Sequence, residues 1–158
     1  MSWESIIKNA TREGEQYYKE YLASMYDWFE TCRGIIREEL DRLEGVLADV
    51  NSRVADAERF GFMNVIEEAR RKGAVVRQLI YKALDDVKDT EKVVRDLEEF
   101  SKDKPIHLVL RSLSEHMSEP FELSSDDMFP ASPILDRKKV DDILHRLDFE
   151  GSGRRDFT

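Results

Sequence analysis

The chain has 158 residues, of which 37% are charged, and a formal net charge of −9. This acidic balance argues against a nucleic-acid module, because such proteins concentrate Lys and Arg to neutralise phosphates. It also weakens any electrostatic attraction to anionic membranes. The single Cys32 excludes an intramolecular disulfide framework, and three scattered histidines give no zinc-ligand spacing. We therefore expect a cytoplasmic protein with no metal, cofactor, nucleic-acid or membrane partner.

Residues 1–16 are expected to be a lead-in, followed by a long helix from Tyr17. Its apolar residues recur in steps of four and three, the spacing of a coiled-coil seam. Between Cys32 and Leu43 the steps run four, four and three, an 11-residue insertion that locally unwinds a left-handed supercoil. The predicted interface residues of this first run are Leu22, Met25, Phe29, Ile36, Leu40, Leu43, Leu47, Val50 and Val54.

A second apolar run, over residues 62–97, alternates steps of four and three for five heptads without a slip. Its predicted interface residues are Phe62, Ile66, Ala69, Gly73, Val76, Ile80, Val87, Val94 and Leu97. Residues 17–100 contain no proline, so we expect one helix of about 125 Å at 1.5 Å per residue. A single helix cannot bury the line of apolar residues along its own surface, so residues 17–100 are predicted to be a dimerisation helix.

An alternative places a turn at Gly61, which would fold the chain into a helical hairpin. No Pro, Asn-Gly or Ser/Gly cluster accompanies this glycine, which favours the uninterrupted helix. The orientation of paired helices, and whether dimers associate into tetramers, stay open.

The sequence changes character after Phe100. Pro105 favours a helix start, and amphipathic spacing predicts a short helix over 105–118. Residues 119–135 combine three prolines with large apolar residues and are predicted to be an extended strap that covers a surface. Asp136 is expected to cap a last helix that ends near Gly151, followed by a disordered tail over 151–158.

The order of these elements resembles the tripartite-motif family, and the C-terminal part is similar to the COS box of its muscle RING-finger and midin-type members. The resembling residues are Asp96–Phe100 at the end of the long helix, Leu108–Met117, Phe129 in the strap, and Val140–Phe149. The last segment satisfies the pattern of an apolar residue, two variable residues, apolar-Leu, two variable residues and Leu-Asp-Phe.

The resemblance implies an antiparallel homodimer whose residues 101–150 fold back on the rod and associate with microtubules or another cytoskeletal filament. The chain has no RING or B-box ligands, so ubiquitin-ligase activity is not carried over. The candidate filament or partner contacts are Arg137, Lys138, Lys139, Ile143, Leu144, Leu147 and Phe149.

Two functions are thus open. The leading hypothesis is a coiled-coil scaffold, all-α, that targets a larger protein to the cytoskeleton. The alternative is a compact helical-bundle adaptor that recognises a partner helix in an open groove, with the chain reversing near Gly61. No nucleophile, base and carboxylate converge in the sequence, so an enzyme is not expected.

Overall fold

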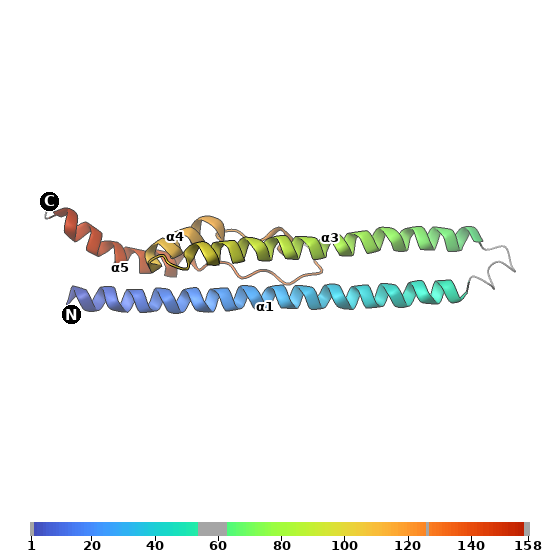
Figure 1. Ribbon diagram of the computed structural model, residues 1–158, viewed down its shortest axis with the longest axis horizontal. Coiled ribbons are helices and arrows are strands. Elements are labelled where there is room, and N and C mark those ends of the chain that lie inside the picture. Colours follow the sequence, from blue (N-terminus) through green and yellow to red (C-terminus); the bar gives the residue numbers. More distant parts are fainter. Residues whose placement is uncertain (1, 54–62, 126, 157–158) are drawn as a thin grey trace. The chain divides into compact units, whose positions relative to one another are not determined.

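The computed structural model describes the backbone of residues 2–53, 63–125 and 127–156, and the side chains of these residues except 63, 125 and 148–156. Within these ranges the protein is helical and has no β-strand, which confirms the all-α fold class (Figure 1). The elements are α1 (Trp3–Ser52), α3 (Met63–Ser101), α4 (Ile106–His116), the 3₁₀ turn η1 (Glu122–Ser125) and α5 (Arg137–Asp156).

These elements form two compact units. The first unit comprises Met1–Trp28 and Thr90–Thr158, and the second unit comprises Phe29–Asp89. Helices α1 and α3 each contribute one segment to both units. We describe each unit by itself.

Helix α1 begins at Trp3, so the prediction of a separate lead-in over residues 1–16 is wrong. The hydroxyl of Ser2 accepts the backbone N–H of Ser5 at 3.3 Å, which satisfies one of the otherwise unpaired amides of the first turn. Ala10 is fully buried one turn before the buried Gly14. The helix therefore already packs at Ala10 and Gly14, within the range predicted as a lead-in.

The second unit pairs the end of α1 with the beginning of α3. A Cβ built on Gly73 would lie 2.6 Å from Cδ2 of Leu47, so glycine allows the two helices to approach closely here. In one uninterrupted helix these two residues would lie about 39 Å apart. The prediction of a single helix over 17–100 is therefore wrong, and α1 ends at Ser52. Gly61, the predicted turn position, lies outside the described residues.

The physical reason is that the two apolar runs of one chain bury each other. An intramolecular partner is present at a far higher effective concentration than a second molecule. Most of the residues assigned to a homodimer interface are consequently covered by the chain itself. Leu22, Met25, Phe29, Ile36, Ile66, Gly73, Ile80, Val87, Val94 and Leu97 are buried, Leu40, Leu43, Leu47, Val50 and Ala69 are half-buried, Val76 is exposed, and Val54 and Phe62 lie outside the described side chains.

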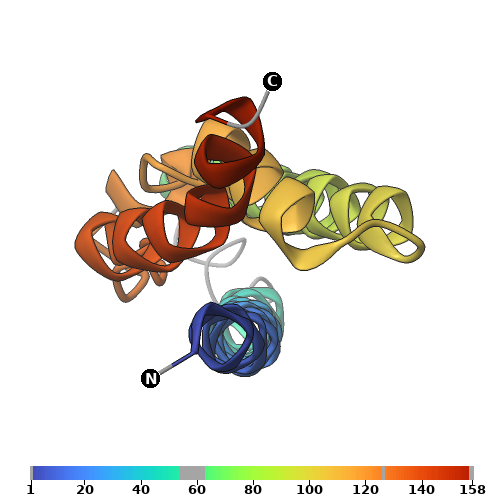
Figure 2. The same ribbon diagram turned by 90° about the vertical axis from the view of Figure 1, so that its left-hand side faces the viewer.

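In the first unit, α1 also lies beside α3, and the C-terminal elements pack against α1 (Figure 2). The hydroxyl of Tyr26 donates to Oε1 of Glu98 at 2.9 Å. Burial, and then the neighbouring Glu98 carboxylate, raise the pKa of Tyr26 to about 12. On the other side of α1, Arg146 of α5 forms an ion pair with Glu13, which lowers the pKa of that carboxyl.

Gly14 is the point where α1 meets both α4 and α5. A Cβ at this position would lie 3.0 Å from Ile106, 3.2 Å from Leu110 and 3.4 Å from Ile143. Leu110 and Ile143 are fully buried. The absence of a side chain at Gly14 therefore lets the two C-terminal helices seat closely on α1.

The strap between α4 and α5 is anchored on Trp28. The indole Nε1–H donates to the carbonyl oxygen of Pro130 at 2.8 Å, and the ring stacks on Phe121 with a centroid separation of 6.0 Å. Phe129, Leu123 and Leu135 are buried. These three residues thus find a covering surface, whereas Met128 and Ile134 of the same segment stay 41% and 52% exposed.

Helix α5 begins as predicted but ends later. Oδ1 of Asp136 accepts the backbone N–H of Lys139 at 3.2 Å, which confirms the predicted cap. The backbone N–H of Asp136 in turn donates to the hydroxyl of Tyr17 at 2.8 Å. The helix continues to Asp156, so residues 151–156 are not the disordered tail that we predicted. Glycines at 151 and 153 each weaken a helix by about 1 kcal/mol without forbidding it.

Candidate partner-binding groove

An apolar groove in the first unit lies between the end of α3 and α4. On α3, Val93, Leu97 and Phe100 follow one another at steps of four and three, so they share one side of the helix. Leu108 faces them from α4, which returns along α3 after a short connection. The groove encloses about 640 Å³. Its walls are therefore two helices joined by a turn.

Three large apolar side chains around this groove remain exposed to solvent. The exposed fraction is 47% for Val93, 58% for Phe100 and 39% for Leu108. Leu97 and Ser112, at 9% each, form the buried floor. An apolar surface bordered by polar residues is a common feature of protein-binding sites.

Charged residues border the groove. Lys104, in the connection between the helices, places Nζ 5.0 Å from the ring centroid of Phe100, a cation–π geometry. Arg111 lines the α4 wall one turn beyond Leu108, and Asp96 and Glu115 lie further from the connection. Charged residues of both signs thus border the groove.

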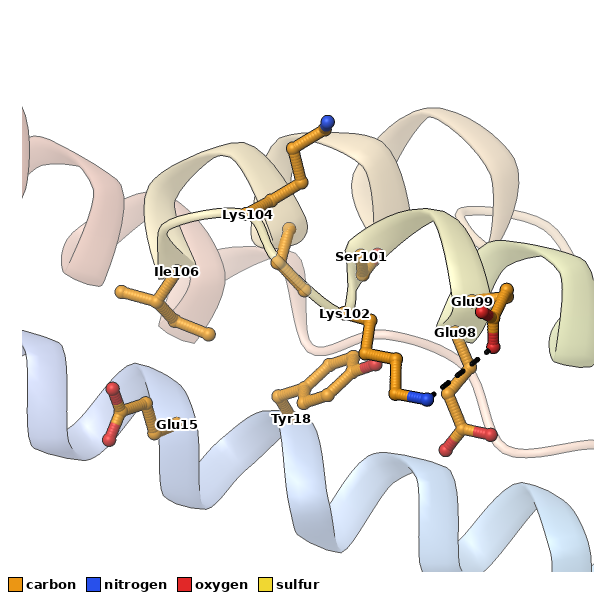
Figure 3. A pocket seen from close by; sticks show the side chains of 9 residues that line it. Glu15, Tyr18, Glu98, Glu99, Ser101, Lys102, Lys104 and Ile106 are labelled. Atoms are coloured by element: carbon orange, nitrogen blue, oxygen red, sulfur yellow. Dashed lines mark ion pairs between the residues drawn. The ribbon is translucent and has the colours of Figure 1, made fainter.

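A second, more polar pocket of about 430 Å³ lies where the α3–α4 connection approaches α1 (Figure 3). Nζ of Lys102 lies 4.0 Å from a carboxylate oxygen of Glu99. Tyr18 projects into the pocket from α1, and burial raises the pKa of its hydroxyl, with the carboxylate of Glu98 as the next cause.

The polar pocket has one unusual group. The hydroxyl of Ser101 is buried without a hydrogen bond of good geometry, although it lies close enough to the hydroxyl of Tyr18 to offset part of the rise that burial causes in the pKa of that group. A nucleophilic serine needs a base within hydrogen-bond reach, and the neighbouring hydroxyl of Tyr18 has a raised pKa. At neutral pH the hydroxyl of Tyr18 is therefore protonated and cannot serve as that base.

The residues that the sequence suggested as filament contacts fall into three groups. Arg137, Lys138 and Lys139 are exposed in the first turn of α5, and Nζ of Lys139 lies 5.5 Å from the ring centroid of Tyr17. Ile143 is fully buried at the junction with α1, so it is a core residue and not a surface contact.

The remaining members of that set give no common surface. Leu144 and Leu147 are half-buried, and the side chain of Phe149 lies outside the described ones. The structure thus leaves only the basic first turn of α5 as an accessible patch from the predicted contacts.

Sequence reasoning missed the groove. The signal was present, because Val93 and Phe100 lie seven residues apart and outside the predicted seam. Leu108 looked like one more residue of an amphipathic helix. Only the relative positions of α3 and α4 show that these three residues surround one concavity.

Cys32, in the second unit, is a core residue, as its position in the seam predicted. It is fully buried, and burial raises the pKa of its thiol to about 11. Because the thiolate is the reactive form, this side chain is chemically quiet at neutral pH.

Comparison with known proteins gave no match to any protein-family model, curated protein or solved structure. Among the helices that the structure describes, none has an apolar stretch long enough to cross a membrane.

Proposed function

We propose that this chain is a helical adaptor module that holds an apolar helix of a partner protein in the groove between α3 and α4. The observation that carries the proposal is the exposure of Val93, Phe100 and Leu108 around one concavity with a buried floor. Amphipathic helices bind such grooves through apolar side chains spaced by three, four and seven residues.

The proposal is tested with a synthetic amphipathic helical peptide that carries Leu at such positions and uncharged polar residues elsewhere. We expect the full chain to bind this peptide in fluorescence anisotropy, and Phe100→Asp and Leu108→Asp each to weaken binding about tenfold or more. Each change removes apolar contact worth about 1.5–3 kcal/mol and leaves a charge in the groove.

Ile134→Asp is the matched control. Ile134 is 52% exposed in the same unit but does not line the groove, so this variant should bind as the unchanged chain does. If the unchanged chain does not bind the peptide, the groove is not the binding site. The same conclusion holds if Phe100→Asp, Leu108→Asp and Ile134→Asp bind the peptide with equal affinity.

A second candidate function is filament targeting, which the COS-box resemblance suggests. It is favoured by one observation, the exposure of Arg137 and Lys138 at the start of α5. Two exposed cations near one another suit an acidic filament surface, and such contacts weaken as salt increases.

For this candidate, Arg137→Glu/Lys138→Glu should reduce co-sedimentation with microtubules about fivefold or more at low salt. Lys8→Glu/Lys19→Glu makes the same charge change at exposed positions of α1 and serves as the control. Equal loss in both double variants would show a general charge effect and remove the support for a filament site.

A further inference from the structure

Three serines of the chain are followed, three positions later, by an acidic residue. They are Ser24 before Asp27, Ser112 before Glu115, and Ser124 before Asp127. Serine kinases that prefer acidic substrates recognise a carboxylate at this spacing, because charge patterns around the serine set their specificity. A kinase binds its substrate segment in an extended conformation, so the same pattern inside a helix is a poor substrate.

Of these three serines, only Ser124 lies outside an α-helix. Ser24 is in α1, where its hydroxyl donates to the carbonyl oxygen of Glu20 at 3.0 Å. Ser112 is in α4 and is 9% exposed. Ser124 is half-buried in the 3₁₀ turn η1, and Asp127 is exposed in the turn that follows. A kinase can therefore reach Ser124 by opening a short segment, whereas the other two serines require unfolding of a helix.

The hydroxyl of Ser124 helps to close the strap. Its oxygen accepts the backbone N–H of Ser132 at 2.8 Å, and the hydroxyl oxygen of Ser132 accepts the backbone N–H of Phe121 at 3.3 Å. Ser132 is 4% exposed. These bonds tie together the two parts of the strap that contact α1, because Phe121 stacks on Trp28 and Pro130 accepts its indole N–H. Ser124 thus supports both contacts with Trp28.

A phosphate on Ser124 would find no cation in the strap or in the adjoining part of α1. Residues 119–135 contain four Asp/Glu and no Lys/Arg. Residues 20–28 of α1 contain Glu20 and Asp27 and likewise no Lys/Arg. A phosphoserine carries a charge of about −1.5 to −2 at pH 7, and beside carboxylates it disrupts local structure by repulsion. The charge of this segment therefore favours an open strap after phosphorylation.

We propose that Ser124 is a phosphorylation site of an acidophilic serine kinase, and that its phosphate releases the strap from Trp28. In this reaction Oγ of Ser124 bonds to the γ-phosphorus of ATP, the bond from that phosphorus to the β,γ-bridging oxygen breaks, and ADP leaves. The catalytic carboxylate of the kinase accepts the hydroxyl proton. The site lies outside the groove between α3 and α4 and does not depend on the function proposed for it.

The first experiment measures phosphate incorporation into the folded full chain. The chain is incubated with an acidophilic serine kinase, ATP and Mg²⁺, and the modified residue is mapped by mass spectrometry. We expect a single phosphate on Ser124 and its loss in Ser124→Ala. Asp127→Asn should lower incorporation about tenfold, because it removes the carboxylate that the kinase recognises, whereas Asp27→Asn, the matched change in α1, should leave incorporation unchanged.

The second experiment follows the surroundings of Trp28, which is 5% exposed. Trp3 is the other tryptophan of the chain, so Trp3→Phe leaves Trp28 as the source of tryptophan emission. Phosphorylation should shift this emission to longer wavelength and raise its quenching by acrylamide about twofold or more, because the strap no longer covers the indole. Treatment with a phosphatase should restore both values.

Several outcomes would overturn the proposal. Absence of phosphate from the folded chain, or phosphate that maps to Ser24, Ser112 or Ser125 instead of Ser124, would remove the site. Phosphorylation of Ser124 with unchanged Trp28 emission would show that the strap stays closed. Reduced quenching would show that the phosphate pairs with the cations of α5 and fastens the strap, the opposite of release.

Discussion

Replacing Trp28 by alanine should destabilise the first unit by about 3–5 kcal/mol, the usual cost of deleting a large buried aromatic side chain. Trp28 is 5% exposed. The substitution removes the hydrogen bond to Pro130 and the stacking partner of Phe121 together. The strap would thus lose its anchor on α1. Urea unfolding followed by circular dichroism measures the change.

Two control variants separate the causes of this loss. Trp28→Phe keeps an aromatic ring but has no N–H donor. It should therefore destabilise the first unit by less than half as much as Trp28→Ala does. Trp3→Ala changes the other tryptophan, which is 38% exposed, and should cost well under 1 kcal/mol. Similar unfolding midpoints for Trp28→Ala and Trp3→Ala would contradict the role of Trp28 as the anchor of the strap.

Placing leucine at Gly14 should destabilise the first unit by about 1–3 kcal/mol, the usual cost of overpacking a core. The first added carbon alone would meet Ile106 at 3.0 Å and Leu110 at 3.2 Å. The remaining carbons need space that α4 and α5 already fill. Because α4 forms one wall of the groove, this variant should also weaken binding of the uncharged helical peptide.

The same substitution at Gly45 is a matched control. A Cβ built there meets nothing within 4 Å, and the residue is exposed. Leucine is the better helix former by about 0.8 kcal/mol, so Gly45→Leu should slightly stabilise α1. If both leucine variants shift the unfolding midpoint in the same direction, close packing at Gly14 does not hold α4 and α5 on α1.

Local features of the fold were readable from the sequence. The apolar spacing around Met25 and Val87 predicted helices and identified core residues, because the period of a helix is fixed by its backbone geometry. Asp136 was recognisable as a cap, since a short acceptor side chain before an amphipathic stretch satisfies the free amides of a first turn. The strap was recognisable from its prolines.

The partner of each apolar stripe was not readable in this way. A seam that contains Leu47 and Gly73 is equally suited to a second copy or to another part of the same chain, because both present the same kind of surface. The predicted homodimer depended on this choice, because one long helix would have needed a second copy to cover its apolar seam. Ile143 was predicted as a surface contact because the sequence did not show that α1 covers it.

By itself, the sequence determined an acidic, helical protein with two apolar stripes, a capped last helix and an apolar strap. These properties depend on neighbours within a few turns. Only the tertiary structure decided that the stripes cover each other, that Gly14 seats α4 and α5 on α1, and that Phe100 and Leu108 face one groove. These contacts join residues far apart in the chain, and periodicity fixes the direction of a side chain but not the surface that it meets.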